Sequence, residues 1–282
     1  MKPSCVILTF FLLLVASKKA NSAEIVNFNF ESFTNDNPLI QLQGAATVLT
    51  DGNVRLTNPI SEVGSAGRVL YAPTVRLWDT ASGRVASFVT TFSLQITDYQ
   101  AFVPADGIIF FIAPENTRIP AGRVVGGGLG VANINGVGAF VGVEFDNHAN
   151  AEYNDPPYSH VGIDVNSVFS SKTVEWNSVS GSVVHVTVIY DSSSNTLSVA
   201  VRNSNDEIIT ISEVVDLKEK LPARVKFGFS AASSPGGRQL HVIRSWSFAS
   251  TLRTGSSENI ITNNGTNIKY APDMMETQIQ SI

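Results

Sequence analysis

Cysteine is almost absent from this chain: Cys5 is the only one among 282 residues. It lies in the first 22 residues, and a chain that has lost that segment contains no disulfide. A secreted domain without cross-links depends on the size of its core, on bound metal or on partner subunits. About 230 residues remain between 23 and 255, and that length is enough to bury a large single core.

Long hydrophobic runs are also missing, with one exception near the N-terminus. The apolar run from Val6 to Val15 follows Lys2 and precedes small residues around Ala23. This order is typical of a secretory signal peptide, and the run is too short to span a bilayer. We therefore expect residues 1–22 to be a signal peptide and the mature chain to begin near Ala23.

Charged residues are scarce as well, at 15% of the chain, and the formal net charge is −5. Lys and Arg are scattered, which argues against the basic surface of a nucleic-acid-binding protein. No second long apolar run follows the first, so nothing indicates a membrane protein. The polar stretch 256–282 lacks alternation, and we expect a loose or processed tail there. Its sequon at Asn264 is the candidate site of N-glycosylation.

What the chain does contain is alternation of apolar and polar residues, together with many Ser, Thr, Gly and Val residues. Short alternating segments separated by turn residues predict an all-β sandwich of one domain, 23–255. One helix is expected over 212–222, where Pro222 ends it. The strands expected most clearly are 24–33, 86–97, 107–114, 139–146, 183–191, 196–203, 224–231 and 241–250.

Polar side chains gather at the end of one predicted strand. Glu144 and Asp146 share one face of it, while Val143 and Phe145 point to the other, apolar face. Two neighbouring carboxylates repel each other, and a cation would remove that penalty. The following loop, which contains a Pro-Pro pair, could fold back and add three more polar groups, Asn150, Asp155 and His160.

The chemistry of these groups does not decide which ion is bound. Oxygen ligands suit calcium, whereas a histidine nitrogen among carboxylates suits an ion such as manganese. An EF-hand is excluded because Ala151 and Pro157 occupy the positions of its glycine and its last glutamate. A structural zinc site is disfavoured without cysteines. The alternative is a solvated acidic loop without any ion.

Five segments stand out from the rest of the sequence: "GRVLYA" (67–72), "PADGIIFFIAP" (104–114), "GGGLGV" (126–131), "VGVEFDNHANAEYNDPPYSHVGIDVNSV" (141–168) and "RVKFGFSA" (224–231). Together they resemble the legume lectin family, especially its galactose-binding members. The resemblance covers nearly the whole mature chain and implies a jelly-roll β-sandwich with a flat back sheet and a curved front sheet.

The resemblance implies two metal ions, and it assigns ligands to each. For manganese the matching residues are Glu144, Asp146, Asp155 and His160. For calcium they are Asp146, Asn150 and Asp155, with the backbone carbonyl of His148.

It also implies a carbohydrate site built from four loops. Asp106 matches a carboxylate that accepts hydrogen bonds from the sugar, and the Ala105–Asp106 bond is cis in the family. Gly127 matches a backbone donor, and Asn150 matches an amide that serves both the sugar and calcium. We assign Glu152 to the rim of this site. The last loop contributes Ser234 and Gly236.

Three positions depart from the family pattern or from its galactose binders. His148 stands where the family places an aromatic ring under the sugar, so we expect weaker galactose binding or a shifted preference. Arg123 and Val125 differ just before the glycines and could alter contacts to a second sugar.

Two rivals to a sugar-binding lectin remain. Glycoside hydrolases of the same sandwich use closely spaced carboxylates, and Glu144-Phe145-Asp146 superficially resembles their pattern. Alternatively, the chain is a lectin-like storage or defence protein with weak or lost sugar binding. The resemblance favours a lectin without catalysis that binds galactose-containing glycans or glycoproteins. It also implies a homodimer or homotetramer that is secreted or stored in a seed vacuole.

Overall fold

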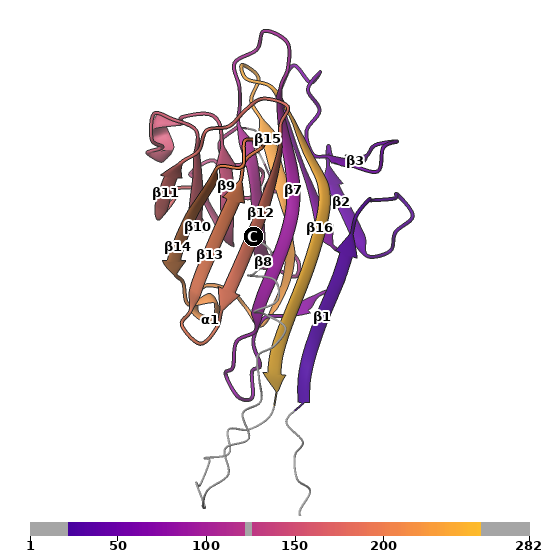
Figure 1. Ribbon diagram of the computed structural model, residues 1–282, viewed down its shortest axis with the longest axis vertical. Helices are drawn as coiled ribbons and strands as arrows, with labels where there is room; N and C mark the ends of the chain where they lie inside the picture. The colour runs from indigo at the N-terminus through magenta and orange to yellow at the C-terminus, as the bar shows by residue number, and fades with distance from the viewer. Residues whose placement is uncertain (1–21, 122–125, 255–282) are drawn as a thin grey trace, which may run out of the picture.

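The computed structural model describes residues 22–121 and 126–254 (Figure 1). The expected signal peptide, Arg123, Val125 and the polar tail with Asn264 lie outside these ranges. Within them, no helix is long and apolar enough to cross a membrane.

Two antiparallel sheets form the body, one behind the other in Figure 1. The back sheet has the order β14-β13-β12-β7-β16-β4-β3, and β1 pairs with β16 beside it. Its strands are β1 Ser22–Phe30, β3 Thr47–Val48, β4 Val54–Arg55, β7 Ser87–Asp98, β12 Val183–Asp191, β13 Thr196–Arg202, β14 Ile208–Val214 and β16 Gln239–Thr254.

The front sheet has the order β11-β10-β9-β8-β15-β5-β2, and β6 pairs with β15. It holds every strand of the candidate site. Its strands are β2 Ile40–Gly44, β5 Ser65–Tyr71, β6 Val75–Arg76, β8 Gly107–Pro114, β9 Val137–Asp146, β10 His160–Ser167, β11 Lys172–Glu175 and β15 Arg224–Ser233.

Alternation decides which side chains enter the core between the sheets. On β12, for example, Val184, Val186 and Val188 are buried, while the residues between them are exposed or half-buried. Aromatic rings fill the space between the sheets: the Phe92 and Phe229 rings meet edge to face, with centroids 4.8 Å apart. Burial of this apolar surface supplies the main stabilisation of a fold without disulfides.

A second buried cluster lies on the other face of the front sheet. On β8, Phe110 belongs to the core between the sheets, whereas its neighbours Ile109 and Phe111 belong to the second cluster. Leu129 and Val131, from the loop between β8 and β9, pack onto these residues. This small core fixes the loop against the sheet.

The eight strands predicted from alternation are all present, with ends shifted by a few residues. The helix predicted over 212–222 is wrong for its first residues, because Ser212 to Val214 belong to β14 and pair with β13. Only α1, Leu217–Lys220, is helical; Asp216 caps it, and Leu221 is already extended. The strand pairing of β14 outweighs the helix propensity of the sequence.

Candidate metal and carbohydrate site

Glu144 and Asp146 occupy the end of β9 and project from the same face of the front sheet. Their exposed fractions are 1% and 2%, so both carboxylates are removed from water. Val143 and Phe145 point the other way into the core between the sheets, as alternation predicts. The packing of Val143 and Phe145 in the core thus fixes the position of the two carboxylates on the other face of the strand.

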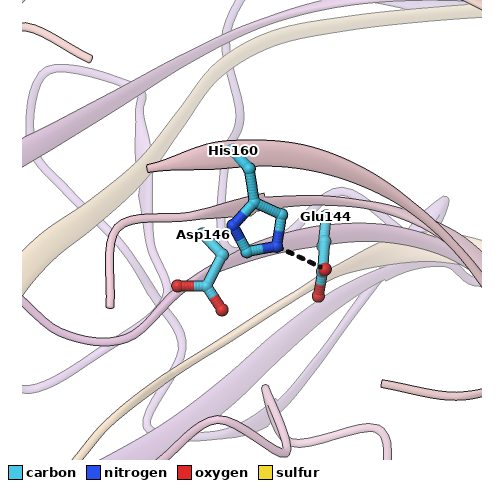
Figure 2. A group of neighbouring side chains, drawn as sticks. All are labelled: Glu144, Asp146 and His160. Atoms are coloured by element: carbon cyan, nitrogen blue, oxygen red, sulfur yellow. Dashed lines mark hydrogen bonds and ion pairs between the residues drawn. The ribbon is translucent and has the colours of Figure 1, made fainter. Parts of the chain in front are cut away.

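His160 begins β10 and lies opposite Asp146 in the β9–β10 register. Its Nδ1 atom lies 3.3 Å from the Tyr158 carbonyl oxygen and its Nε2 atom 3.1 Å from Glu144 Oε1. A carbonyl can only accept, so Nδ1 carries a proton and Nε2 is the atom that faces the carboxylates. Figure 2 shows this contact with Asp146 beside it. Metal-binding histidines commonly have this arrangement.

One ligand atom from each of Glu144, Asp146 and His160 lies within 4.8 Å of the others. Burial, reinforced by Glu144, raises the pKa of Asp146 well above its ordinary value. Burial alone would lower the pKa of His160, but its hydrogen bond to Glu144 and the nearby carboxylates raise it. The cluster therefore favours a bound positive charge.

The loop after β9 folds back onto the cluster, as the sequence predicts. The 3₁₀ helix η1, Ala151–Tyr153, turns the chain, and the backbone N–H of Asn150 donates to Asp155 Oδ2 at 2.7 Å. The backbone N–H of His148 donates to Asp146 Oδ1 at 2.6 Å. These bonds hold the loop against the end of the strand.

The loop also brings uncompensated polar groups to the cluster. Burial raises the pKa of Asp155 to about 6, although its hydrogen bond from Asn150 works in the opposite direction. Among the described residues, Asn150 Oδ1 is a buried oxygen without a hydrogen-bond partner. These groups are suitable metal ligands of two kinds. The carboxylates and the unpaired amide oxygen suit a hard cation, and the imidazole suits a transition-metal ion beside it.

Sequence reasoning missed two residues that contact the cluster. The hydroxyl of Ser170 lies 2.6 Å from Glu144 Oε1 and 2.7 Å from Asp164 Oδ1. Asp164 is 0% exposed. Glycine at position 162 makes space for the Glu144 side chain, because a Cβ there would lie 2.5 Å from Glu144 Oε1. The alternation of β10, which places Asp164 on the same face as His160, was the available signal for Asp164. Ser170 lies beyond the end of β10, and no such signal marked it.

Asp106 forms the adjoining part of the site, just before β8. Its peptide bond to Ala105 is cis, as the resemblance implies. The side chain is 1% exposed, and burial raises its pKa to about 7 despite a hydrogen bond from the Ser234 backbone N–H. Within the described residues, Asp106 Oδ2 has no hydrogen-bond partner. This carboxylate oxygen is thus available to a ligand.

The loop of glycines meets Asp106 and Asn150. A Cβ built on Gly127 would lie 2.3 Å from Asn150 Oδ1, and one on Gly126 would lie 3.9 Å from Asp106 Oδ1. Three loops far apart in sequence therefore converge on one place. The ring of His148 lies beside them, with Nδ1 3.2 Å from the Pro104 carbonyl oxygen.

The remaining predicted residues lie at the surface. Glu152 is exposed, but its charge contributes to the raised pKa of Asp106. Ser234 is half-buried and reaches Asp106 through its backbone. Gly236 is exposed, and a Cβ there would meet no atom within 4 Å.

A family model for the legume lectin domain matches residues 25–264. The chain belongs to the legume lectin family. A galactose-binding lectin of Arachis hypogaea is 65% identical over 264 residues, which are 93% of this chain and 96% of that one. The anti-H(O) lectin of Lotus tetragonolobus is 48% identical over 238 residues, which are 81% of this chain and 98% of that one.

Solved legume lectins have the same fold. A peanut lectin in complex with a nine-residue peptide superposes with a TM-score of 0.80 at 64% identity, covering 82% of this chain and all of that one. A Lotus tetragonolobus seed lectin has a TM-score of 0.78 at 43% identity, with coverage of 82% and 100%. The jelly-roll sandwich expected from the sequence is therefore confirmed.

Proposed function

We propose that this legume lectin is a metal-dependent carbohydrate-binding protein that recognises galactose or N-acetylgalactosamine and catalyses no reaction. The observation that carries the proposal is the convergence of Asp106, Gly127 and Asn150, with buried oxygens of Asp106 and Asn150 left unpaired by the described protein. Buried polar groups without partners are costly, and sugar hydroxyls or a cation would satisfy them.

Two ions would organise the site. Glu144, Asp146, Asp155 and His160 would hold manganese. Asp146, Asn150, Asp155 and the backbone carbonyl of His148 would hold calcium. The ions would neutralise the repelling carboxylates and keep the loop of Asn150 in place. Asp106 and Asn150 are then ordered before the sugar arrives, and little ordering entropy is lost on binding.

The preference for galactose is supported by the relatives. The lectin of Arachis hypogaea that is 65% identical carries galactose binding in its name. An acidic winged bean lectin, 36% identical with a TM-score of 0.74, was solved with methyl-α-D-galactose. Ser234 and Gly236 stand in the loop that the proposal assigns to galactose recognition, and Glu152 stands at the rim.

A glycoside hydrolase is the disfavoured alternative. Its two carboxylates need access to a glycosidic bond. Glu144 and Asp146 are at most 2% exposed, and Glu144 is already bonded to His160 and Ser170. Release of reducing sugar from a β-glucan would revive this alternative.

Partners and location follow from the same proposal. Galactose-containing glycans or glycoproteins would be bound weakly at each shallow site, and a homodimer or homotetramer would multiply the strength of attachment. The protein would be secreted or stored in a vacuole. Light scattering of the mature protein measures the assembly directly, and a monomer at all concentrations would contradict this part.

Titration calorimetry with galactose and mannose tests the main proposal. The protein should be loaded with calcium and manganese, and Asp106→Asn serves as the matched variant. We expect galactose to bind, mannose to bind more weakly, and both chelation and Asp106→Asn to abolish the heat. A glycan array without any bound glycan would instead favour the storage or defence protein.

A further inference from the structure

The loop of residues 126–131 needs a support that the metal ligands do not provide. It contributes none of the proposed ligands, yet Gly127 is packed tightly against Asn150. Gly126 and Gly130 have φ angles of +95° and +68°, and Leu129 one of +48°. Such backbone persists only where its surroundings hold it.

Arg68 lies directly beneath this loop. It stands on β5 and is 1% exposed. Its Nε donates to the Gly130 carbonyl oxygen at 3.0 Å, and a second guanidinium nitrogen donates to the same oxygen. The third nitrogen donates to Thr117 Oγ1 at 3.1 Å, and the guanidinium carbon lies 4.9 Å from the centre of the Phe111 ring.

No ion pair explains why an arginine is buried here. Among the described residues, no carboxylate lies within 4.0 Å of the Arg68 guanidinium. Burial lowers its pKa to about 10, which still leaves it charged at neutral pH. An unpaired buried charge is expensive unless its hydrogen bonds are made. Arg68 makes them with the loop and with Thr117.

Ser230 acts beside it from the neighbouring strand. It pairs with Arg68 in the β5–β15 register. Its hydroxyl donates to the Leu129 carbonyl oxygen at 2.6 Å. Two cross-strand neighbours therefore bind the carbonyls of two consecutive loop residues, Leu129 and Gly130, from the rigid sheet.

We propose that Arg68, assisted by Ser230, is a positioning residue that holds the loop of residues 126–131 in register with Asp106 and Asn150. It thereby fixes the Gly127 backbone at the sugar and sets carbohydrate affinity without affecting the metal ions. The site thus has two independent supports: ions for Asp106 and Asn150, and a buried guanidinium for the loop of glycines. The link to affinity rests on the proposed carbohydrate function.

The test compares Arg68→Lys and Ser230→Ala with Ile243→Val, a change in the core of the back sheet that should lower stability without touching the loop. Three quantities are measured on the full mature protein: hydrogen exchange of the Leu129 and Val131 amides, galactose affinity by calorimetry, and manganese and calcium affinity. The Leu129 and Val131 amides are informative because they donate within the loop, to Gly126 and Gly128 at 3.0 and 2.9 Å.

We expect Arg68→Lys to accelerate exchange of both amides and to weaken galactose binding by about tenfold or more, since a buried bond to a charged group is lost. Ser230→Ala should produce smaller changes in the same direction, and it serves alone if Arg68→Lys does not fold. Metal affinity should stay within about twofold of the unsubstituted protein. Ile243→Val should change neither exchange nor affinity.

Each contrary result has its own meaning. Unchanged exchange would overturn the positioning role itself. Faster exchange with unchanged galactose affinity would overturn its link to the sugar. A parallel loss of metal affinity would show a general structural defect and also overturn the proposal. If the unsubstituted protein binds no glycan, the carbohydrate function fails, while exchange still decides whether Arg68 holds the loop.

Discussion

Glu144 and Asp164 are two buried carboxylates joined by a single hydroxyl, that of Ser170. Ser170 Oγ lies 2.6 Å from the first and 2.7 Å from the second. One hydroxyl hydrogen cannot satisfy both oxygens. Burial and the charge of Glu144 raise the pKa of Asp164 well above its ordinary value. The pair orients Glu144 toward His160.

Ser170→Ala should therefore weaken manganese binding. Without the hydroxyl, Glu144 loses a hydrogen bond that fixes its rotamer. Loss of such supporting contacts typically costs about ten- to hundredfold in metal affinity. Ser171→Ala is the matched control, since its hydroxyl bonds the Ile163 carbonyl and Glu213 instead. Equal manganese affinity of the two variants in a competition titration would contradict this role.

Most contacts at the polar end of β9 could be predicted from the sequence. The period of two placed Glu144 and Asp146 on one face, and the Pro-Pro loop indicated that Asn150, Asp155 and His160 would return to it. Local pattern suffices for such contacts because they join neighbouring strands. Matched family segments added Asp106, which no local pattern connects with the cluster.

The contacts of Arg68 and Ser230 with the loop of residues 126–131 could not be predicted from the sequence, because the partners are far apart along the chain. Arg68 and Gly130 are 62 positions apart, and Ser230 and Leu129 are 101 apart. Only the order of β5, β15 and β8 in the front sheet brings them together. The short strands β3, β4 and β6, of two residues each, were missed because two residues cannot display alternation.

Metal loading should release protons near neutral pH. Burial raises the pKa of Asp146, and it raises that of Asp155 to about 6. Both must ionise to bind a cation, so apparent metal affinity should rise with pH across about pH 5 to 7. Calorimetry in buffers of different ionisation enthalpy measures the released protons. Metal binding at pH 6 without any buffer dependence would contradict the prediction.

Asp155 and Asp106 give the stability of the metal-free protein the opposite dependence on pH. Their pKa values are higher in the folded than in the unfolded chain, so their contribution to stability is present at low pH. It is lost as the pH rises through the folded pKa values, about 6 for Asp155 and about 7 for Asp106. Unfolding of the metal-free protein in urea should show this loss, and saturating metal should remove it.

His241 should destabilise the protein in acid. It is 0% exposed, its Nδ1 atom lies 2.9 Å from Thr57 Oγ1, and burial lowers its pKa to about 3. Between pH 6.5 and 3 the unfolded chain binds the additional proton, so stability falls as the pH falls, by up to about 1.4 kcal/mol per pH unit. His241→Asn should flatten this part of the urea-unfolding profile, whereas His185→Asn, at an exposed position, should not.

His148→Tyr should strengthen galactose binding. A phenol ring offers a larger apolar face to the sugar than imidazole, and such contacts are worth about two- to tenfold in affinity. The substitution removes the contact of His148 with the Pro104 carbonyl. Calcium affinity should not change, because the proposed ligand is the backbone carbonyl of residue 148. An unaltered galactose affinity in calorimetry would mean that this ring does not limit binding.

Gly127→Ala and Gly236→Ala should have different effects, because Gly127 lies on the crowded side of the carbohydrate site and Gly236 on its open side. A Cβ at Gly127 would lie 2.3 Å from Asn150 Oδ1 and 2.9 Å from Tyr153 Cε2, so Asn150 must move from its position. Overpacking of this size typically costs about 1 to 3 kcal/mol.

A Cβ at Gly236 would meet nothing within 4 Å. We expect Gly127→Ala to reduce both galactose and calcium affinity by at least about tenfold. Gly236→Ala should leave calcium affinity unchanged, and any effect on galactose would then come from direct contact with the sugar. Normal calcium affinity in Gly127→Ala would contradict the assignment of Asn150 as a calcium ligand.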